Sequence, residues 1–310
     1  MNKVTRLKYY IESLCIYDFE DDDVFSALYD LLCDDDEDTV ALQSYFFKEL
    51  AKSESLKKHI SRLILTNDNI FTKAACAGKV GELSIAVMNA VKSDLAKLEE
   101  IASLTAQDII AGVDDEEIKE ILLTLPGWEV GKALAPLDKN WDKQIDELVK
   151  YHRENGYGIY AKNIAFTWRD EEITPVNSID TIRLTDLKNY ELQRNKVIDN
   201  TESFIAGHPA NNVLLYGDRG TGKSSTVHAI LNEYWQKGLR MIEIPKSAVA
   251  DLSLIREQIA DSPMKFIIYI DDLSFDSNDT SFSELKAALE GSLSGKQYYY
   301  LRYFKQTPFN

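Results

Sequence analysis

The stretch GDRGTGKSS, residues 217–225, combines residue types that bind phosphate at the spacing such a site requires. Residues 217–224 fit the pattern G-x-x-x-x-G-K-[ST] at every position. Glycines let the backbone fold closely around phosphate groups and turn N–H groups inward, and a following helix adds the positive end of its dipole. The sequence therefore predicts a nucleotide phosphate site made by Gly217, Asp218, Arg219, Gly220, Thr221, Gly222, Lys223, Ser224 and Ser225.

Two side chains of this loop would act on the ligand directly. Lys223 can reach the β and γ phosphates as a point charge, and the hydroxyl of Ser224 can join the ligand shell of Mg²⁺. We therefore expect ATP and Mg²⁺ as the bound cofactors. An ordinary glycine turn is the alternative, but the order strand, glycine loop and helix argues against it.

A phosphate loop of this kind needs a carboxylate partner, and the segment MKFIIYIDDLSF supplies two. Residues 266–270 form a continuous apolar run, typical of a buried strand, which ends in Asp271 and Asp272. Ligands lie at the carboxyl ends of parallel strands. Asp271 would hold Mg²⁺, directly or through water, and Asp272 would orient or deprotonate the attacking water. The alternative is an acidic turn after a core strand.

The segments around these motifs must form the sheet that positions them. We predict parallel strands near residues 213–216, 240–244 and 266–271, with helices at 224–235 and 251–263. The fold class is therefore α/β, a three-layer parallel sheet of the P-loop NTPase type. A strand lies in sequence between the glycine loop and the acidic strand, which favours ATPases over small-molecule kinases by analogy of topology.

Residues 1–156 are predicted to form an acidic, all-helical domain, because apolar residues recur there every three or four positions. The acidic clusters at 18–23 and 34–38 are either a partner-binding surface or solvated loops and helix N-termini. The helical segments expected are 24–33, 41–53, 56–66, 82–104 and 142–155.

The rest of the chain divides into three parts. Residues 157–180 are expected to be extended, as a hairpin or a linker, and residues 181–296 to form a partial ATPase domain. Within that domain, residues 184–207 predict one amphipathic helix ended by Gly207. Residues 297–310 form a tail of a different character.

Charge and composition restrict the partners. The net charge is −16, and the first 180 residues hold 20 basic and 35 acidic residues, or −15 of it. This balance argues against binding of nucleic acid or an anionic membrane by that part. The sequence shows no apolar run of signal-peptide or membrane-span type, so we expect a cytoplasmic protein. Cys15, Cys33 and Cys76 lack metal-site spacing and are expected to be buried thiols.

Residues from about 180 to 296 resemble the AAA+ ATPases, and more closely a bacterial AAA+-like ATP-binding family of uncharacterised function. The resemblance lies in YGDRGTGKSS, GLRMIEIPK, IYIDDLSFD and ELKAALEGSLSGK, with FIAGHPANNVLLYG leading into the loop. It implies that the loop residues bind nucleotide phosphates and that Asp271 is the Mg²⁺ carboxylate. Asp272 stands where most AAA+ proteins carry Glu, which is one methylene longer.

The resemblance also implies parts that have no match here: a sensor strand, an arginine finger and a helical lid. The leading expectation is an ATP hydrolase that, in intact form, uses nucleotide binding and release to move or load a macromolecular partner. The alternative is a non-hydrolysing, nucleotide-dependent adaptor or helicase-loader-like protein. In either case the helical N-terminal domain would dock a protein partner, and ring-like homo-oligomers follow by analogy only.

The tail Tyr298 to Phe304 is β-favouring and of strand length. We predict that it lies between the glycine-loop strand and the acidic strand, where AAA+ proteins place the sensor strand. We also expect that the tail after about Lys296 results from a reading-frame shift, so that the chain is C-terminally truncated and hydrolyses ATP weakly or not at all. The alternative is an aromatic C-terminal strand in its own right.

Overall fold

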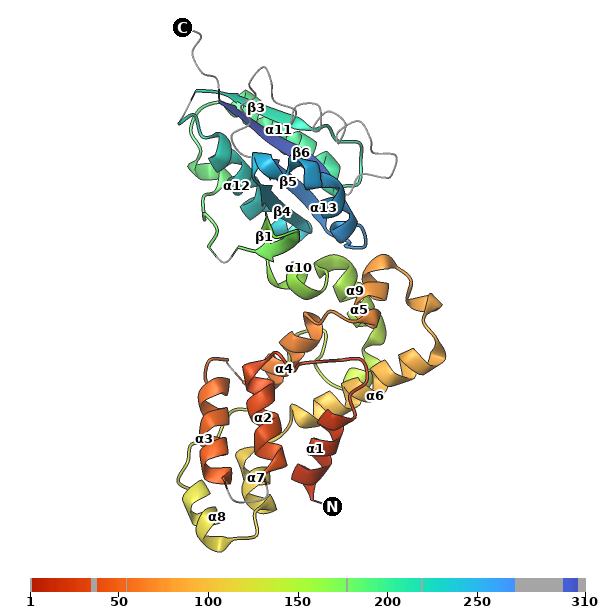
Figure 1. Ribbon diagram of the computed structural model, residues 1–310, viewed down its shortest axis with the longest axis vertical. Helices are drawn as coiled ribbons and strands as arrows, with labels where there is room; N and C mark the ends of the chain where they lie inside the picture. The colour runs from red at the N-terminus through yellow and green to blue at the C-terminus, as the bar shows by residue number, and fades with distance from the viewer. Residues whose placement is uncertain are drawn as a thin grey trace. The chain divides into compact units, whose positions relative to one another are not determined.

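The computed structural model describes residues 2–34, 38–53, 55–176, 178–218, 220–270 and 298–305. The chain divides into two compact units, Met1–Arg153 and Glu154–Asn310. The first unit is helical and the second holds a mostly parallel sheet (Figure 1). The predicted α/β class with a helical N-terminal region is thus confirmed.

The five helices predicted for the first unit are present as α2, α3, α4, α6 and α9, and several shorter helices that the sequence did not signal accompany them. Side-chain caps fix many of the starts: Asp22 accepts from the N–H of Phe25, and Asn69 and Thr72 form a capping box. The helices are α1 (Lys3–Glu12), α2 (Asp23–Cys33), α3 (Thr39–Leu50), α4 (Leu56–Leu65), α5 (Ile70–Ala77), α6 (Ile85–Ile101), α7 (Ala106–Gly112), α8 (Glu116–Leu122) and α9 (Ile145–Asn155), with 3₁₀ turns at Val80–Glu82 and Trp141–Lys143.

A buried carboxylate, Asp94 of α6, holds the segment that follows α1. Its Oδ2 accepts from the backbone N–H groups of Cys15 (2.9 Å), Ile16 (2.7 Å) and Tyr17 (3.4 Å). Lys97 Nζ lies 3.8 Å from the other carboxylate oxygen. Burial, and then the charge of Asp94, raise the pKa of Tyr17 above its usual value. Asp94 therefore fixes the chain just ahead of the acidic cluster at 18–23.

The thiols do not share one environment. Cys76 is buried, and its Sγ donates to the carbonyl oxygen of His152 (3.0 Å). Burial raises the pKa of Cys76 to about 12. Cys33 is half-buried and Cys15 is exposed, so the prediction of buried thiols is wrong for Cys15. That prediction rested on the general tendency of free thiols to be buried, whereas Cys15 lies in the non-helical segment between α1 and α2.

A hydrogen-bonded chain of Ser53, His59 and Asp22 connects the ends of three helices. His59 Nδ1 lies 2.8 Å from Ser53 Oγ, and its Nε2 lies 2.8 Å from Asp22 Oδ1. The order of groups is that of a hydrolytic triad. Here, however, Asp22 caps α2, Ser53 closes the turn after α3 and His59 is buried in α4, so helix packing accounts for each contact.

The charge of Asp22 makes the first unit sensitive to acid. Burial acts to raise the pKa of Asp22, but hydrogen bonds from His59 and from the N–H groups of Phe25 and Val24 outweigh it and hold the pKa below its usual value. A lowered pKa means that the ionised carboxylate stabilises the folded state above the usual Asp pKa, and that this contribution is lost as pH falls through the lowered value.

We therefore expect Asp22→Asn to lower the free energy of unfolding by about 1–2 kcal/mol at pH 7, the size of a charged cap with its hydrogen bonds. The difference in unfolding free energy between the two proteins should narrow as pH falls below about 4, where the Asp22 carboxylate becomes protonated. Urea unfolding of both proteins between pH 7 and pH 3 measures it, and Asp30→Asn, at an exposed position of α2, is the matched control. A gap that does not change with pH would contradict the assigned role.

The second unit is built on a six-stranded sheet of order β2-β1-β4-β5-β6-β3. All neighbours run parallel except β1 and β2. The strands predicted near 213–216, 240–244 and 266–271 are confirmed as β3, β4 and β5. The strands are β1 (Ala165–Arg169), β2 (Glu172–Pro175), β3 (Val213–Gly217), β4 (Leu239–Ile244), β5 (Lys265–Ile270) and β6 (Tyr298–Lys305).

Helices cover both faces of this sheet, which gives it three layers. One core cluster joins Ile267 and Tyr269 of β5 to Val227 and Ile230 of the helix after β3. The other joins Phe266, Ile268 and Ile270 to the helix before β5. Successive residues of β5 thus alternate between the two cores, as a buried strand requires. The helices are α10 (Gly158–Lys162), α11 (Glu191–Ile205), α12 (Lys223–Tyr234) and α13 (Leu252–Ile259), with 3₁₀ turns at Leu184–Asp186, Trp235–Lys237 and Lys246–Asp251.

Strand β6 lies between β5 and β3, which confirms the position predicted for the tail (Figure 1). Leu301 is in register with Tyr269 on one side and with Val213 on the other. Without β6 the adjoining edges of β5 and β3 would leave backbone hydrogen-bonding groups without partners. The tail therefore joins the glycine-loop strand to the rest of the sheet.

Two local predictions need correction. The helix expected over 184–207 begins only at Glu191, because Asn189 and Tyr190 adopt left-handed backbone angles (φ 65° and 58°) that interrupt it. Strand β3 was expected to be buried, but it is the last strand of the sheet in the part of the chain that the structure describes, and Leu214 and Tyr216 are 50% and 74% exposed. The segment 157–180 was expected to be extended, as a hairpin or a linker; residues 165–175 do form a hairpin, whose first strand pairs with β4, but Gly158–Lys162 forms the helix α10 and the prediction is wrong there.

Candidate nucleotide site

The glycine loop joins the carboxyl end of β3 to the first turn of α12. Gly222 is the N-terminal cap of α12, and Gly220 and Gly222 have φ angles of 81° and 79°. A Cβ added at either would meet no heavy atom within 4 Å. These positions therefore favour glycine because of the left-handed backbone and not because of crowding. The loop between strand and helix is exposed at Asp218 and Gly220.

Lys223 lies inside this loop and is only 8% exposed. Its Nζ donates to the carbonyl oxygens of Gly217 (3.1 Å) and Asp218 and to Thr221 Oγ1 (2.9 Å). Thr221 Oγ1 in turn donates to the carbonyl oxygen of Asp218 (2.9 Å). The ammonium group is thus surrounded by oxygens of the loop itself, at the centre of the turn that the backbone makes.

Ser224 is the second residue of α12, and its hydroxyl contacts the sheet. Its Oγ is 3.0 Å from the phenolic oxygen of Tyr269, the fifth residue of β5. Ser225 is half-buried beside it. One turn further along α12, the ring of His228 packs edge-to-face against Tyr269, with centroids 6.4 Å apart. The first turn of the helix is therefore attached to the strand that leads to the predicted acidic pair.

Three predicted site residues, Arg219, Asp271 and Asp272, lie outside the described residues. The strands that lead to them can be compared. Ile270, the last residue of β5, and Leu214 of β3 are both in register with Arg302 of β6. Because the three strands are parallel, β5 and β3 end at the same edge of the sheet.

The sequence reasoning missed Tyr269. A signal was present, since Tyr269 precedes Asp271 by two residues and strand side chains alternate with a period of two. A tyrosine in an otherwise aliphatic core strand also needs a partner for its hydroxyl. What the sequence could not supply is which residue of α12 meets it.

Comparison with known families adds one match. Residues 161–303 match the model of a family described as "Protein of unknown function (DUF815)". The matched range is under half of the chain and includes β1 to β5, the glycine loop and the first part of β6. No curated protein matches the chain. The match extends beyond Lys296, and the reading-frame shift stays a prediction.

Two further findings concern metals and membranes. In the described ranges, no three His, Cys, Asp or Glu side chains come together as a metal site would require. None of the helices in those ranges combines the length and the apolar character needed to span a membrane.

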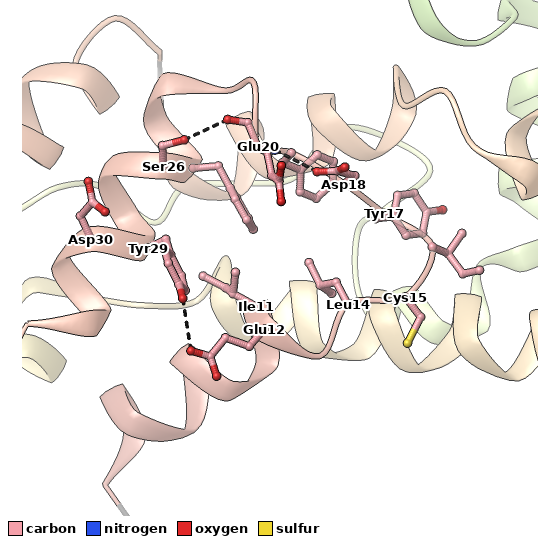
Figure 2. Close-up of a pocket in the computed structure, with 13 residues that line it drawn as sticks. Ile11, Glu12, Leu14, Cys15, Tyr17, Asp18, Glu20, Ser26, Tyr29 and Asp30 are labelled. Carbon is pink, nitrogen blue, oxygen red and sulfur yellow. Dashed lines mark hydrogen bonds between the residues drawn. The ribbon is translucent and has the colours of Figure 1, made fainter.

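The first unit contains a pocket of about 560 Å³ between α1, α2 and the segment that joins them (Figure 2). Buried Phe19 and Phe25 and the half-buried Ile11 and Leu14 supply apolar walls. At one end Tyr29 donates to Glu12 Oε1 (3.2 Å), as Figure 2 shows. The pocket is also lined by the exposed carboxylates Glu12, Asp18, Glu20 and Asp30.

Proposed function

We propose that the chain is an AAA+-type P-loop protein that binds ATP with Mg²⁺ at the loop between β3 and α12. One observation carries this: a lysine, Lys223, is buried inside a loop with two left-handed glycines, at the start of a 12-residue helix. A helix N-terminus and a cation meet at one point of this loop, and phosphate favours that arrangement because loop N–H groups can turn toward it.

The contacts of Lys223 indicate how a phosphate would enter. The Nζ group donates to three oxygens of the loop, two of them backbone carbonyls. Phosphate oxygens carry full charge and form stronger hydrogen bonds with an ammonium group than neutral carbonyls do. Nucleotide would therefore displace at least part of these contacts, and Lys223 would turn from the loop to the β and γ phosphates.

Hydrolysis would depend on Asp271 and Asp272. Side chains of β5 alternate between the two faces of the sheet, and the side chain of Tyr269 lies on the face of Ser224. Position 271 is two residues further on, so the same alternation would give it the same face. We propose that Asp271 and the hydroxyl of Ser224 hold Mg²⁺ and that Asp272 orients the attacking water. A macromolecular partner would respond to the nucleotide state. Localisation in the cytoplasm and association into homo-oligomers belong to the same proposal.

Calorimetric titration with ATP, in Mg²⁺ buffer, tests binding, and phosphate release tests turnover. We expect saturable binding and a slow hydrolysis that Asp272→Asn abolishes. Asp261→Asn, at an exposed position just after α13, is the matched control and should leave turnover unchanged. Turnover that survives in Asp272→Asn would contradict the assigned role of Asp272, and an absence of ATP binding would exclude the proposed function.

A second candidate is a nucleotide-dependent adaptor that binds ATP without turnover. The pocket of the first unit favours it, because none of its four lining carboxylates is within ion-pair distance of a basic side chain in the described parts of the chain. Carboxylates around apolar walls suit a protein segment with Lys or Arg next to an apolar residue. ATP binding without phosphate release by the wild type would favour the adaptor.

A further inference from the structure

The contact between Tyr269 and Ser224 joins a core strand to the hydroxyl proposed to bind the metal. Tyr269 is 1% exposed, and its phenolic oxygen is 3.0 Å from Ser224 Oγ. Buried tyrosine hydroxyls need a hydrogen-bond partner, and many residues could provide one. In this fold one partner is Ser224, the side chain that the glycine-loop pattern places on Mg²⁺.

Tyr269 is held firmly enough to position another group. Its backbone lies in the middle of the sheet, in register with Glu243 of β4 and Leu301 of β6. Its ring belongs to the core cluster formed with Val227 and Ile230 of α12, and the ring of His228 stands nearly perpendicular to it, at 88°. The phenolic oxygen therefore has a fixed place relative to both β5 and the first turn of α12.

The chemistry of a hydroxyl allows both contacts at once. A serine oxygen has one proton and two lone pairs. One hydrogen bond with Tyr269, whichever of the two donates, leaves a lone pair of Ser224 Oγ for a metal ion. Mg²⁺ accepts only oxygen ligands close to octahedral geometry, so it gains from a ligand whose rotamer is already set.

We propose that Tyr269 is the positioning residue for the metal-binding hydroxyl of Ser224 and that it makes nucleotide binding at this loop depend on Mg²⁺. This inference rests on the proposed function, since it assumes that the loop binds nucleotide. It goes beyond the glycine-loop pattern, which contains neither Tyr269 nor any residue of β5.

The test compares ATP affinity in Mg²⁺ buffer with ATP affinity in EDTA, for the wild type and Tyr269→Phe. The substitution keeps the ring and removes one oxygen. We expect the ratio of ATP affinity in Mg²⁺ buffer to ATP affinity in EDTA to be about three- to tenfold lower in Tyr269→Phe than in the wild type. A change of this size corresponds to the loss of a hydrogen bond of ordinary net strength. The affinity in EDTA should not change, because Tyr269 does not contact phosphate in this scheme. A loss of packing alone would lower both affinities together.

Tyr234→Phe is the matched control. Tyr234 is buried in the same core cluster, on α12, but its hydroxyl donates to Glu202 Oε1 (2.8 Å), away from Ser224. Its affinity ratio should equal that of the wild type. Ser224→Ala should lower the ratio at least as much as Tyr269→Phe, and adding Tyr269→Phe to Ser224→Ala should change it no further.

The outcomes separate the two proposals. Equal affinity ratios for the wild type and Tyr269→Phe, or a higher ratio in the variant, would overturn the role of Tyr269 while nucleotide binding stands. A Ser224→Ala protein with the wild-type ratio would overturn it as well, even if Tyr269→Phe does not fold. Failure of the wild type to bind ATP in both buffers would overturn the proposed function and this inference with it.

Discussion

Replacing Lys223 with alanine is expected to weaken ATP binding about a hundredfold. Lys223 is the cation at the centre of the glycine loop, buried among the oxygens of Gly217, Asp218 and Thr221. Hydrogen bonds to charged groups contribute about 1.5–3 kcal/mol each, and one factor of ten in affinity corresponds to about 1.4 kcal/mol. Loss of a charged contact to two phosphates therefore gives an effect of this size. Calorimetry with ATP and Mg²⁺ measures it.

The control for this variant is Lys196→Ala, at an exposed position of α11 in the same unit. It removes the same charge from the unit without touching the loop and should bind ATP like the wild type. Because Lys223 also holds the loop together through its hydrogen bonds, thermal unfolding of both variants should be recorded in the absence of nucleotide. Equal ATP affinity in Lys223→Ala and the wild type would contradict the assignment of the loop.

Proline at position 301 is expected to destabilise the second unit by at least about 3 kcal/mol, since proline lacks an N–H and obstructs pairing inside a sheet. Leu301 is in register with Tyr269 of β5 and with Val213 of β3, so the change affects the strand that joins them. Protection from hydrogen exchange should be lost first at Val213–Gly217, because β6 is the strand through which β3 pairs with the sheet in the described part of the chain.

Hydrogen exchange read by mass spectrometry resolves this effect along the chain. Peptides from α2, α4 and α6 belong to the other unit and provide an internal reference. Leu301→Val keeps the N–H and the β-favouring character of the position, and it should exchange like the wild type. Unchanged protection of β3 in Leu301→Pro would mean that β6 does not hold the glycine-loop strand in place.

The parts of the fold that follow from local pattern could be predicted from sequence. Short segments rich in apolar residues located β4 and β5, and period-3.6 patterns located α12 and α13, each to within a few residues, because these elements bury one face or both. The position of the tail strand followed from the strand order of the AAA+ proteins that the sequence resembles, together with the requirement that backbone groups inside a sheet be paired. The sequence also located a glycine loop between β3 and α12, because its pattern is contained in eight consecutive residues; its binding of nucleotide stays a prediction.

The parts that depend on distant residues could not be predicted. The contact between Tyr269 and Ser224 joins positions 45 residues apart, and the contact between His59 and Asp22 joins positions 37 apart. Both depend on how helices are placed against other elements. The start of α11 was misplaced for another reason: two left-handed residues, Asn189 and Tyr190, break a pattern that is otherwise periodic. Nothing in the apolar spacing signals such a break.

The position of β3 at the border of the sheet also affects how the protein behaves in concentrated solution. Among the described residues β3 has a strand partner on one side only, so the N–H and C=O groups on its other side can pair with another chain, and the exposed side chains of Leu214 and Tyr216 add apolar contact area. The net charge of −16 keeps molecules apart at low ionic strength. Salt screens that repulsion, and the screening length is about 8 Å at physiological ionic strength. Self-association through β3 should therefore increase with ionic strength and with protein concentration. The protein should be most monomeric in dilute, low-salt solution.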